Sequence, residues 1–190
     1  MKELGRKFVG TWNTFTLVSV AVGAALFGVL MVYASIPVFT NTNLTAAMIV
    51  PVVVGGLFGP LPAFITMGVG NMIADMLFGG FWPAWSVANA VLGLFIGALP
   101  LYGADIRKGK FTIIHAAIYA VLVVVGNAIA FGFVAPFITQ YILGIDAELS
   151  LLQAIPASIA NIAVQIIVGI PLLFLLSRRF ASRTNLQEED

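Results

Sequence analysis

Asp75 is the single carboxylate within the long apolar stretches of this sequence, and its side chain is the first candidate for chemistry. Burying a carboxylate in an apolar membrane-like environment costs on the order of 3 kcal/mol, so such a residue usually has a functional role. Asn71 precedes it by four residues and therefore shares its helical face. Two interpretations are open. Asp75 either interacts with a bound ligand, as a hydrogen-bond acceptor or a counter-charge, or it caps the loop that follows.

Aromatic and carboxamide side chains follow Asp75 at short spacing. Trp82 and Trp85 come next, and Asn89 shares a helical face with Trp85 at four-residue spacing. A belt of aromatic residues at a lipid interface would account for one tryptophan. The combination of stacking rings, carboxamides and a carboxylate is more typical of a site for a small, planar, polar ligand.

Further carboxamides occur in other apolar segments and in the first polar loop. For any one of them, hydrogen bonding between helices is the common use. Asn161 and Gln165 are again four residues apart, which places them on one helical face. We expect the binding set to comprise Asn41, Asn43, Asn71, Asp75, Trp82, Trp85, Asn89, Asn127, Asn161 and Gln165.

Small residues follow one side of the first apolar stretch. Ala21 and Ala25 are four residues apart, as are Ala24 and Gly28. Small side chains at this spacing let two helices approach closely. We expect Ala21, Ala25 and Gly28 to contact a helix of a partner protein.

The composition predicts the environment of these residues. The chain has 190 residues, of which 61% are hydrophobic and 9% charged, against about 25% charged in a typical soluble domain. A globule of this size cannot bury so much apolar surface, so we expect a lipid bilayer as the solvent. The formal net charge of +1 argues against nucleic acid as a partner, because that would require a concentrated basic face.

Hydropathy predicts an all-α integral membrane protein of one domain, a six-transmembrane-helix bundle. The expected spans are approximately 14–34, 44–59, 61–78, 84–103, 112–140 and 151–177. The nine Lys and Arg residues lie at 2–7, 107–110 and 178–183, all on one side of such a bundle. By the positive-inside rule, the N- and C-termini are then both cytoplasmic. The first apolar run is longer than the core of a signal peptide, so we expect it to be retained.

Several kinds of chemistry find no support in the sequence. There is no cysteine and only one histidine, His115, so we expect no metal site and no cofactor. A membrane enzyme using Asp75 as a general base would usually need a second titratable group nearby, so no catalytic residue is expected. The stretch 103–111 faintly resembles a phosphate-binding loop, but its spacing is wrong, Phe111 replaces the Ser or Thr, and no strand precedes it. The chain is therefore not expected to bind ATP by such a loop. If it moves a solute uphill, the energy would come from a gradient or from a partner protein.

Four segments, taken in order, resemble a known family. They are Val22–Leu30, Gly56–Pro60, Gly70–Asp75 with the Trp82 and Trp85 loop, and Ala160–Ile162. The chain resembles the substrate-binding S-components of energy-coupling-factor (ECF) vitamin transporters, in particular the formerly uncharacterised riboflavin-type group.

The resemblance implies six helices, both termini cytoplasmic, and a place in a prokaryotic plasma membrane. It also implies capture of a vitamin or vitamin precursor at the outer face, with a transmembrane coupling subunit and two ATPase subunits as partners. Ala21 and Ala25 would meet the coupling subunit. Riboflavin, thiamine or its pyrimidine precursor are favoured as ligands, and cobalamin is possible. The alternatives are a gradient-driven small-solute transporter and a channel-forming homo-oligomer with a ring of Asp75 side chains.

Overall fold

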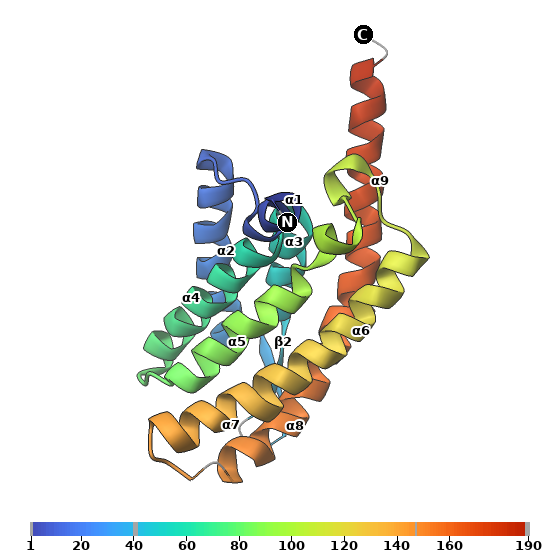
Figure 1. Ribbon diagram of the computed structural model, residues 1–190. Coiled ribbons are helices and arrows are strands. Elements are labelled where there is room, and N and C mark those ends of the chain that lie inside the picture. Colours follow the sequence, from blue (N-terminus) through green and yellow to red (C-terminus); the bar gives the residue numbers. More distant parts are fainter. Residues whose placement is uncertain (1, 40–41, 147, 189–190) are drawn as a thin grey trace.

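The computed structural model describes residues 2–39, 42–146 and 148–188, which form a helical bundle with one two-stranded hairpin (Figure 1). The helices are α1 (Lys2–Val9), α2 (Thr14–Tyr33), α3 (Ile49–Phe58), α4 (Pro60–Phe78), α5 (Pro83–Ile96), α6 (Ile113–Ile129), α7 (Ala135–Phe137), α8 (Glu148–Ala163) and α9 (Gly169–Glu188). The short amphipathic helix α1 was not predicted from the sequence.

Five helical segments in the described part of the chain are long and apolar enough to cross a membrane. They are Thr14–Tyr33, Pro60–Phe78, Pro83–Tyr102, Ile113–Ile142 and Ser150–Ser182. These segments correspond to five of the six predicted spans. The remaining prediction, 44–59, corresponds to a shorter apolar helix, Ala46–Phe58. It begins two residues later than predicted because Thr45 caps it, with Thr45 Oγ1 accepting a hydrogen bond from the Ala47 amide at 3.1 Å.

Two paired strands form in the loop between the first two expected spans, 14–34 and 44–59. Strands β1 (Ser35–Phe39) and β2 (Thr42–Thr45) pair antiparallel, with Ser35 opposite Thr45 and Ile36 opposite Leu44. Strand β2 packs against α8. The hairpin therefore links the end of α2 to the later helices of the bundle.

Glycines allow α2, α4 and α5 to pack at close range. A Cβ atom added at Gly70 of α4 would lie 2.8 Å from the Phe27 side chain and 2.9 Å from the Ala24 carbonyl oxygen, both on α2. On α5, a Cβ at Gly93 would lie 2.6 Å from the Ala63 carbonyl oxygen of α4. Small residues at such contacts bring helices together where no hydrophobic effect can, because lipid is as apolar as the side chains. These contacts fix the position of α4 relative to α5.

The later helices contain π-helical turns. Helix α6 continues through a π-helical segment (Ala130–Val134) into α7 and a second such segment (Ile138–Ile142), and α8 continues through a third (Val164–Val168) into α9. Each π-turn shifts the helical register by one residue, and such turns are frequent at functional sites. Phe131 and Gln165 lie in these turns and are fully buried. The turns thus point two large side chains into the bundle.

Both chain termini lie toward the same end of the bundle (Figure 1). The segment between α5 and α6 lies at this end too, whereas the α4–α5 corner and the turn between α7 and α8 lie at the other (Figure 1). The clusters of basic residues at 6–7, 107–110 and 178–179 therefore share one end, which we call the basic end. The Asp75 region lies at the opposite end.

Replacing Gly93 with alanine should destabilise the protein by about 1–3 kcal/mol, because the new methyl group meets the backbone of α4, which cannot move aside without separating the helices. Thermal unfolding in detergent, followed by tryptophan fluorescence, measures this. The same change at Gly132, where a Cβ meets nothing within 4 Å, is the control and should be neutral or slightly stabilising. Equal unfolding midpoints for the two variants would show that the α4–α5 contact is not tight.

Candidate ligand-binding site

A cavity of about 600 Å³ is lined by residues at the end of the bundle opposite the basic end. Its wall is formed by the end of α2, strand β2, the α4–α5 corner, and residues of the later helices. The size lies within the range of roughly 300–1,000 Å³ that is common for small-molecule sites. Of the predicted binding set, the lining includes Asn43, Asn71, Asp75, Trp82, Trp85, Asn89 and Asn161.

The Asp75 carboxylate connects α4 to the start of α5. Its Oδ2 atom accepts hydrogen bonds from the Trp82 amide at 3.0 Å and from Ser86 Oγ at 3.3 Å. Asn71 Nδ2 donates a third at 3.4 Å. Since Trp82 is the residue that precedes α5, Asp75 caps the loop after α4, which was one of the two predicted interpretations. The carboxylate also lines the cavity, so the capping role does not exclude contact with a ligand.

A chain of carboxamides continues from Asp75 into the bundle. Asn71 Nδ2 also donates to Ser86 Oγ at 3.1 Å, and Asn89 Nδ2 donates to Asn71 Oδ1 at 3.0 Å. A second bond from Asn89 Nδ2 reaches the Trp85 carbonyl oxygen at 3.0 Å. The Asn89 Oδ1 atom is buried and has no partner among the described residues. A buried acceptor left unpaired costs about 1–3 kcal/mol, so this oxygen is a ready acceptor for a donor group in the cavity.

Two aromatic rings pack together in the wall of the cavity. The Trp85 and Phe131 rings have centroids 5.3 Å apart and are tilted by 36°. Trp82 also lines the cavity but is 58% exposed, which is typical of a residue at its mouth. The cavity thus has polar groups from α4 and α5 beside an aromatic surface.

Three predicted binding residues do not line the cavity as described. Asn41 lies outside the described residues. Asn127 Nδ2 donates to the Gln165 side-chain oxygen at 3.1 Å, and Gln165 Nε2 donates to Met48 Sδ at 3.5 Å. Both carboxamides are fully buried and join α6 to the π-turn before α9. They therefore lie behind Met48, which itself lines the cavity, and neither of them lines it directly.

The sequence reasoning missed several residues of the wall. Ser86 was missed as well: it does not line the cavity itself, but its hydroxyl bonds both Asp75 and Asn71, and its three-residue spacing from Asn89 could have identified it. Phe131 carried no such signal, because its inward direction depends on the π-turn that contains it. Ser150, whose buried hydroxyl has no partner among the described residues, was also missed.

The charge of the cavity is acidic. Its lining contains the carboxylates Asp75 and Asp146 and, among the residues that the structure describes, no Lys, Arg or His. An anionic ligand would enter without a counter-charge, which is costly at low dielectric constant. Within the described ranges, no group of three or more His, Cys, Asp or Glu residues is gathered in a way that could hold a metal ion.

The expected contact face on α2 divides into two parts. Ala21 and Ala25 are exposed on the surface of the chain. Gly28 is buried, and a Cβ there would lie 2.6 Å from the Ile73 side chain and 2.9 Å from the Gly70 carbonyl oxygen of α4. Gly28 therefore serves the packing of α2 against α4 within the chain, which leaves Ala21 and Ala25 as the exposed part of the expected contact face.

Membrane-length helices, together with a cavity that combines aromatic and polar side chains at one end of the bundle, are typical of a membrane-embedded solute-binding protein. The sequence model of the family described as ECF-type riboflavin transporter, S component, matches residues 11–178. The chain belongs to this family. Its members are transporter subunits that bind a small vitamin ligand and work with a membrane-embedded ECF module, and they are not enzymes.

Comparisons with individual proteins agree with this assignment. A UPF0397 protein of Photobacterium profundum is 34% identical over 92% of this chain and 97% of its own length. A UPF0397 protein of Aliivibrio fischeri is 32% identical, over 91% and 96% of the two chains. Among solved structures, a crystal structure of FolT bound with folic acid has a TM-score of 0.59 at 16% identity, covering 88% of this chain and 98% of FolT. That likeness shows a shared fold.

Asp75→Ala should lower the free energy of unfolding by about 1.5–3 kcal/mol even without ligand, because the charged acceptor that ties the α4–α5 loop to Trp82 and Ser86 is lost. Asp75→Asn keeps an acceptor oxygen and should lose less. The thermal unfolding midpoint in detergent is the measurement. Asp146→Ala is the control, since Asp146 is exposed and accepts one hydrogen bond, from the Glu148 amide. If Asp75→Ala unfolds no earlier than Asp146→Ala, the cap does not hold the α4–α5 corner.

Proposed function

We propose that this chain captures a neutral or weakly cationic heteroaromatic vitamin, or a vitamin precursor, in the cavity beside Asp75 and delivers it through an ECF-type importer. The observation that carries the proposal is the arrangement of the cavity wall. A hydrogen-bonded set of Asp75, Asn71 and Asn89 faces the same space as the packed rings of Trp85 and Phe131. Such a wall suits a ligand that combines a flat ring with hydrogen-bond donors.

The unpaired groups in the wall support a particular ligand character. Asn89 Oδ1 is an acceptor without a donor, and the carboxylates of Asp75 and Asp146 favour positive charge or N–H and O–H groups. Riboflavin, thiamine and its pyrimidine precursor carry such donors on planar rings. Cobalamin remains an alternative. Strongly anionic compounds are disfavoured because no basic side chain of the described residues lines the cavity.

We further propose six membrane crossings with both termini in the cytoplasm of a prokaryotic cell. The shorter helix Ala46–Phe58 would complete the sixth crossing together with the hairpin that precedes it. The common location of the termini at the basic end supports an even number of crossings (Figure 1). The positive-inside rule then directs the basic end to the cytoplasm and the cavity to the outside.

The proposed partners are a transmembrane coupling subunit and two ATPase subunits. Family membership supports the requirement for such a module. The exposed residues Ala21 and Ala25 form a narrow, small-residue surface on α2 that would let a partner helix approach closely.

Titration of the purified chain with riboflavin, thiamine, its pyrimidine precursor and cobalamin, followed by tryptophan fluorescence, tests the ligand class. We expect tight binding of one neutral or cationic heteroaromatic compound. Trp85→Ala and Asp75→Asn should each weaken it roughly 10- to 100-fold, because they remove the ring contact and the negative charge respectively.

His115→Ala is the control for this titration. His115 caps the start of α6 through Thr112, away from the cavity, and its loss should change affinity little. Tight binding of a polyphosphate or a simple dicarboxylate would contradict the proposed ligand class. Normal binding by both cavity variants, together with a defect in His115→Ala, would mean that the ligand binds at the other end of the bundle.

The double variant Ala21→Leu and Ala25→Leu should abolish co-purification with the coupling subunit and uptake into cells, while ligand affinity is retained. Larger side chains on this surface hold a partner helix away. Leu26→Phe is the control, because Leu26 is exposed on α2 and lies about 100° or more around the helix from both Ala21 and Ala25. Loss of ligand binding together with partner binding would indicate that Ala21 and Ala25 support the fold of the chain instead.

A further inference from the structure

A second cavity, of about 360 Å³, lies at the basic end of the bundle. Its wall comes from the end of α1, the start of α2, the end of α3 and the segment between α5 and α6. It is separate from the ligand cavity, and no lining residue is shared between the two. The segment 103–110, singled out in the sequence for its faint likeness to a phosphate-binding loop, forms one side of it.

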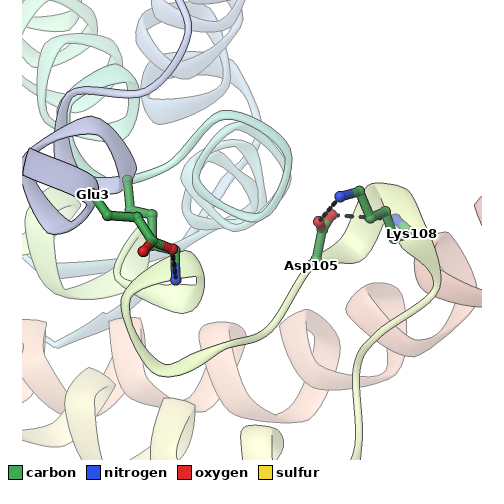
Figure 2. A network of polar contacts seen from close by, with 4 residues as sticks. Glu3, Asp105 and Lys108 are labelled. Carbon is green, nitrogen blue, oxygen red and sulfur yellow. Dashed lines mark hydrogen bonds and ion pairs between the residues drawn. The ribbon is translucent and has the colours of Figure 1, made fainter.

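The lining of this cavity carries a large excess of positive charge. Five basic side chains, those of Arg6, Lys7, Arg107, Lys108 and Lys110, face one carboxylate, that of Asp105. Two of these cations are neutralised by ion pairs: Lys7 with Glu3 at 3.4 Å, and Lys108 with Asp105 at 3.7 Å (Figure 2). Within the described part of the chain, the other three form no ion pair. Like charges that line one cavity repel each other, and a bound anion reduces this repulsion, so the cavity favours an anion.

The Arg107 side chain is held in place by aromatic rings. Its guanidinium carbon lies 4.5 Å from the centroid of Phe58 and 5.9 Å from that of Phe15. Burial lowers the pKa of this guanidinium, an effect that the nearby charge of Asp105 partly offsets, but an arginine remains charged at neutral pH. The rings contact the guanidinium group itself, whose N–H groups form no hydrogen bond or ion pair with the described residues. A fixed guanidinium is well suited to two-point recognition of a phosphate group.

The surroundings of the cavity place it at the level of lipid headgroups. Helix α1 is amphipathic and exposes Leu4 and Phe8, and the exposed side chains of Trp12 and Phe15 follow directly. A short amphipathic helix with basic residues on its polar face lies in the plane of the membrane interface. The exposed apolar surface of α2 continues from Phe15 to Leu17, where acyl chains of a lipid could lie. A soluble anion would gain nothing from these apolar neighbours.

We infer that the cavity between α1 and the 103–110 segment binds the phosphate of an anionic phospholipid, with Arg107, Arg6 and Lys110 as its cationic partners. The apolar groups of α1 and the start of α2 contact the rest of the lipid. The bound lipid joins four separate segments of the basic end and thereby stabilises it.

Native mass spectrometry and thermal unfolding of the full chain in a neutral detergent, titrated with short-chain phosphatidylglycerol or phosphatidylcholine, test the inference. We expect phosphatidylglycerol to bind and to raise the unfolding midpoint, and phosphatidylcholine to do so weakly or not at all. Each removed cation should weaken phosphatidylglycerol binding roughly fivefold, so Arg6→Gln with Arg107→Gln should weaken it about 25-fold. Arg107→Lys, which keeps the charge and loses the fork, should have an intermediate affinity.

Arg178→Gln with Arg179→Gln is the matched control, because these exposed arginines belong to the same end of the bundle but do not line the cavity. It should bind phosphatidylglycerol as the unchanged chain does. Equal losses in the two double variants would overturn the inference in favour of general charge attraction. If Arg107→Gln does not fold, Arg6→Gln with Lys110→Gln provides the same comparison.

Two further outcomes would also overturn the inference of phospholipid binding. If inorganic phosphate stabilises the chain as strongly as phosphatidylglycerol does, the site binds a free anion and not a lipid. If phosphatidylglycerol binds no better than phosphatidylcholine, but the cavity variants lose the coupling subunit, the basic lining docks an acidic protein surface. Ligand titration at the opposite cavity should be unchanged in every variant, which keeps this test independent of the proposed function.

Discussion

The close approach of α4 and α5 is the constraint on which the candidate site depends. Gly93 lets the two backbones come so near that a single methyl group would meet the Ala63 carbonyl. The Asp75 carboxylate then closes the corner between these helices by accepting bonds from the Trp82 amide and Ser86. Without both features, the carboxamides of Asn71 and Asn89 would not meet, and Trp85 would not be directed at Phe131.

The two ends of the bundle carry side chains of opposite charge. At the Asp75 end, a carboxylate in an apolar setting is stabilised by three hydrogen-bond donors, and no basic side chain of the described residues lines the cavity. At the other end, basic side chains crowd around a cavity with a single carboxylate in its lining. This polarity suits a protein that accepts an uncharged or cationic solute at one membrane surface and is anchored at the other.

The later helices contribute to the site through irregular geometry. The π-turns at Ala130–Val134 and Val164–Val168 direct Phe131 and Gln165 inward, and the Asn127–Gln165 bond then joins α6 to the turn before α9. These carboxamides lie behind Met48 and hold the wall of the cavity in place. The site is therefore supported by a buried polar layer, which is expensive unless its members are paired.

The sequence by itself determined the membrane environment, the approximate positions of the apolar helices and the region around Asp75, because hydropathy and helical spacing are local properties. Spacing by four residues correctly placed Asn71 beside Asp75 and brought Asn89 next to Trp85. Only the tertiary structure decided which polar residues face the cavity. Asn127 and Gln165 looked equivalent to Asn89 in sequence, yet they pair with each other. Gly28 looked equivalent to Ala25, yet it packs against α4 inside the chain. The hairpin, the π-turns and the basic cavity likewise arise from contacts between distant segments, which no local pattern encodes.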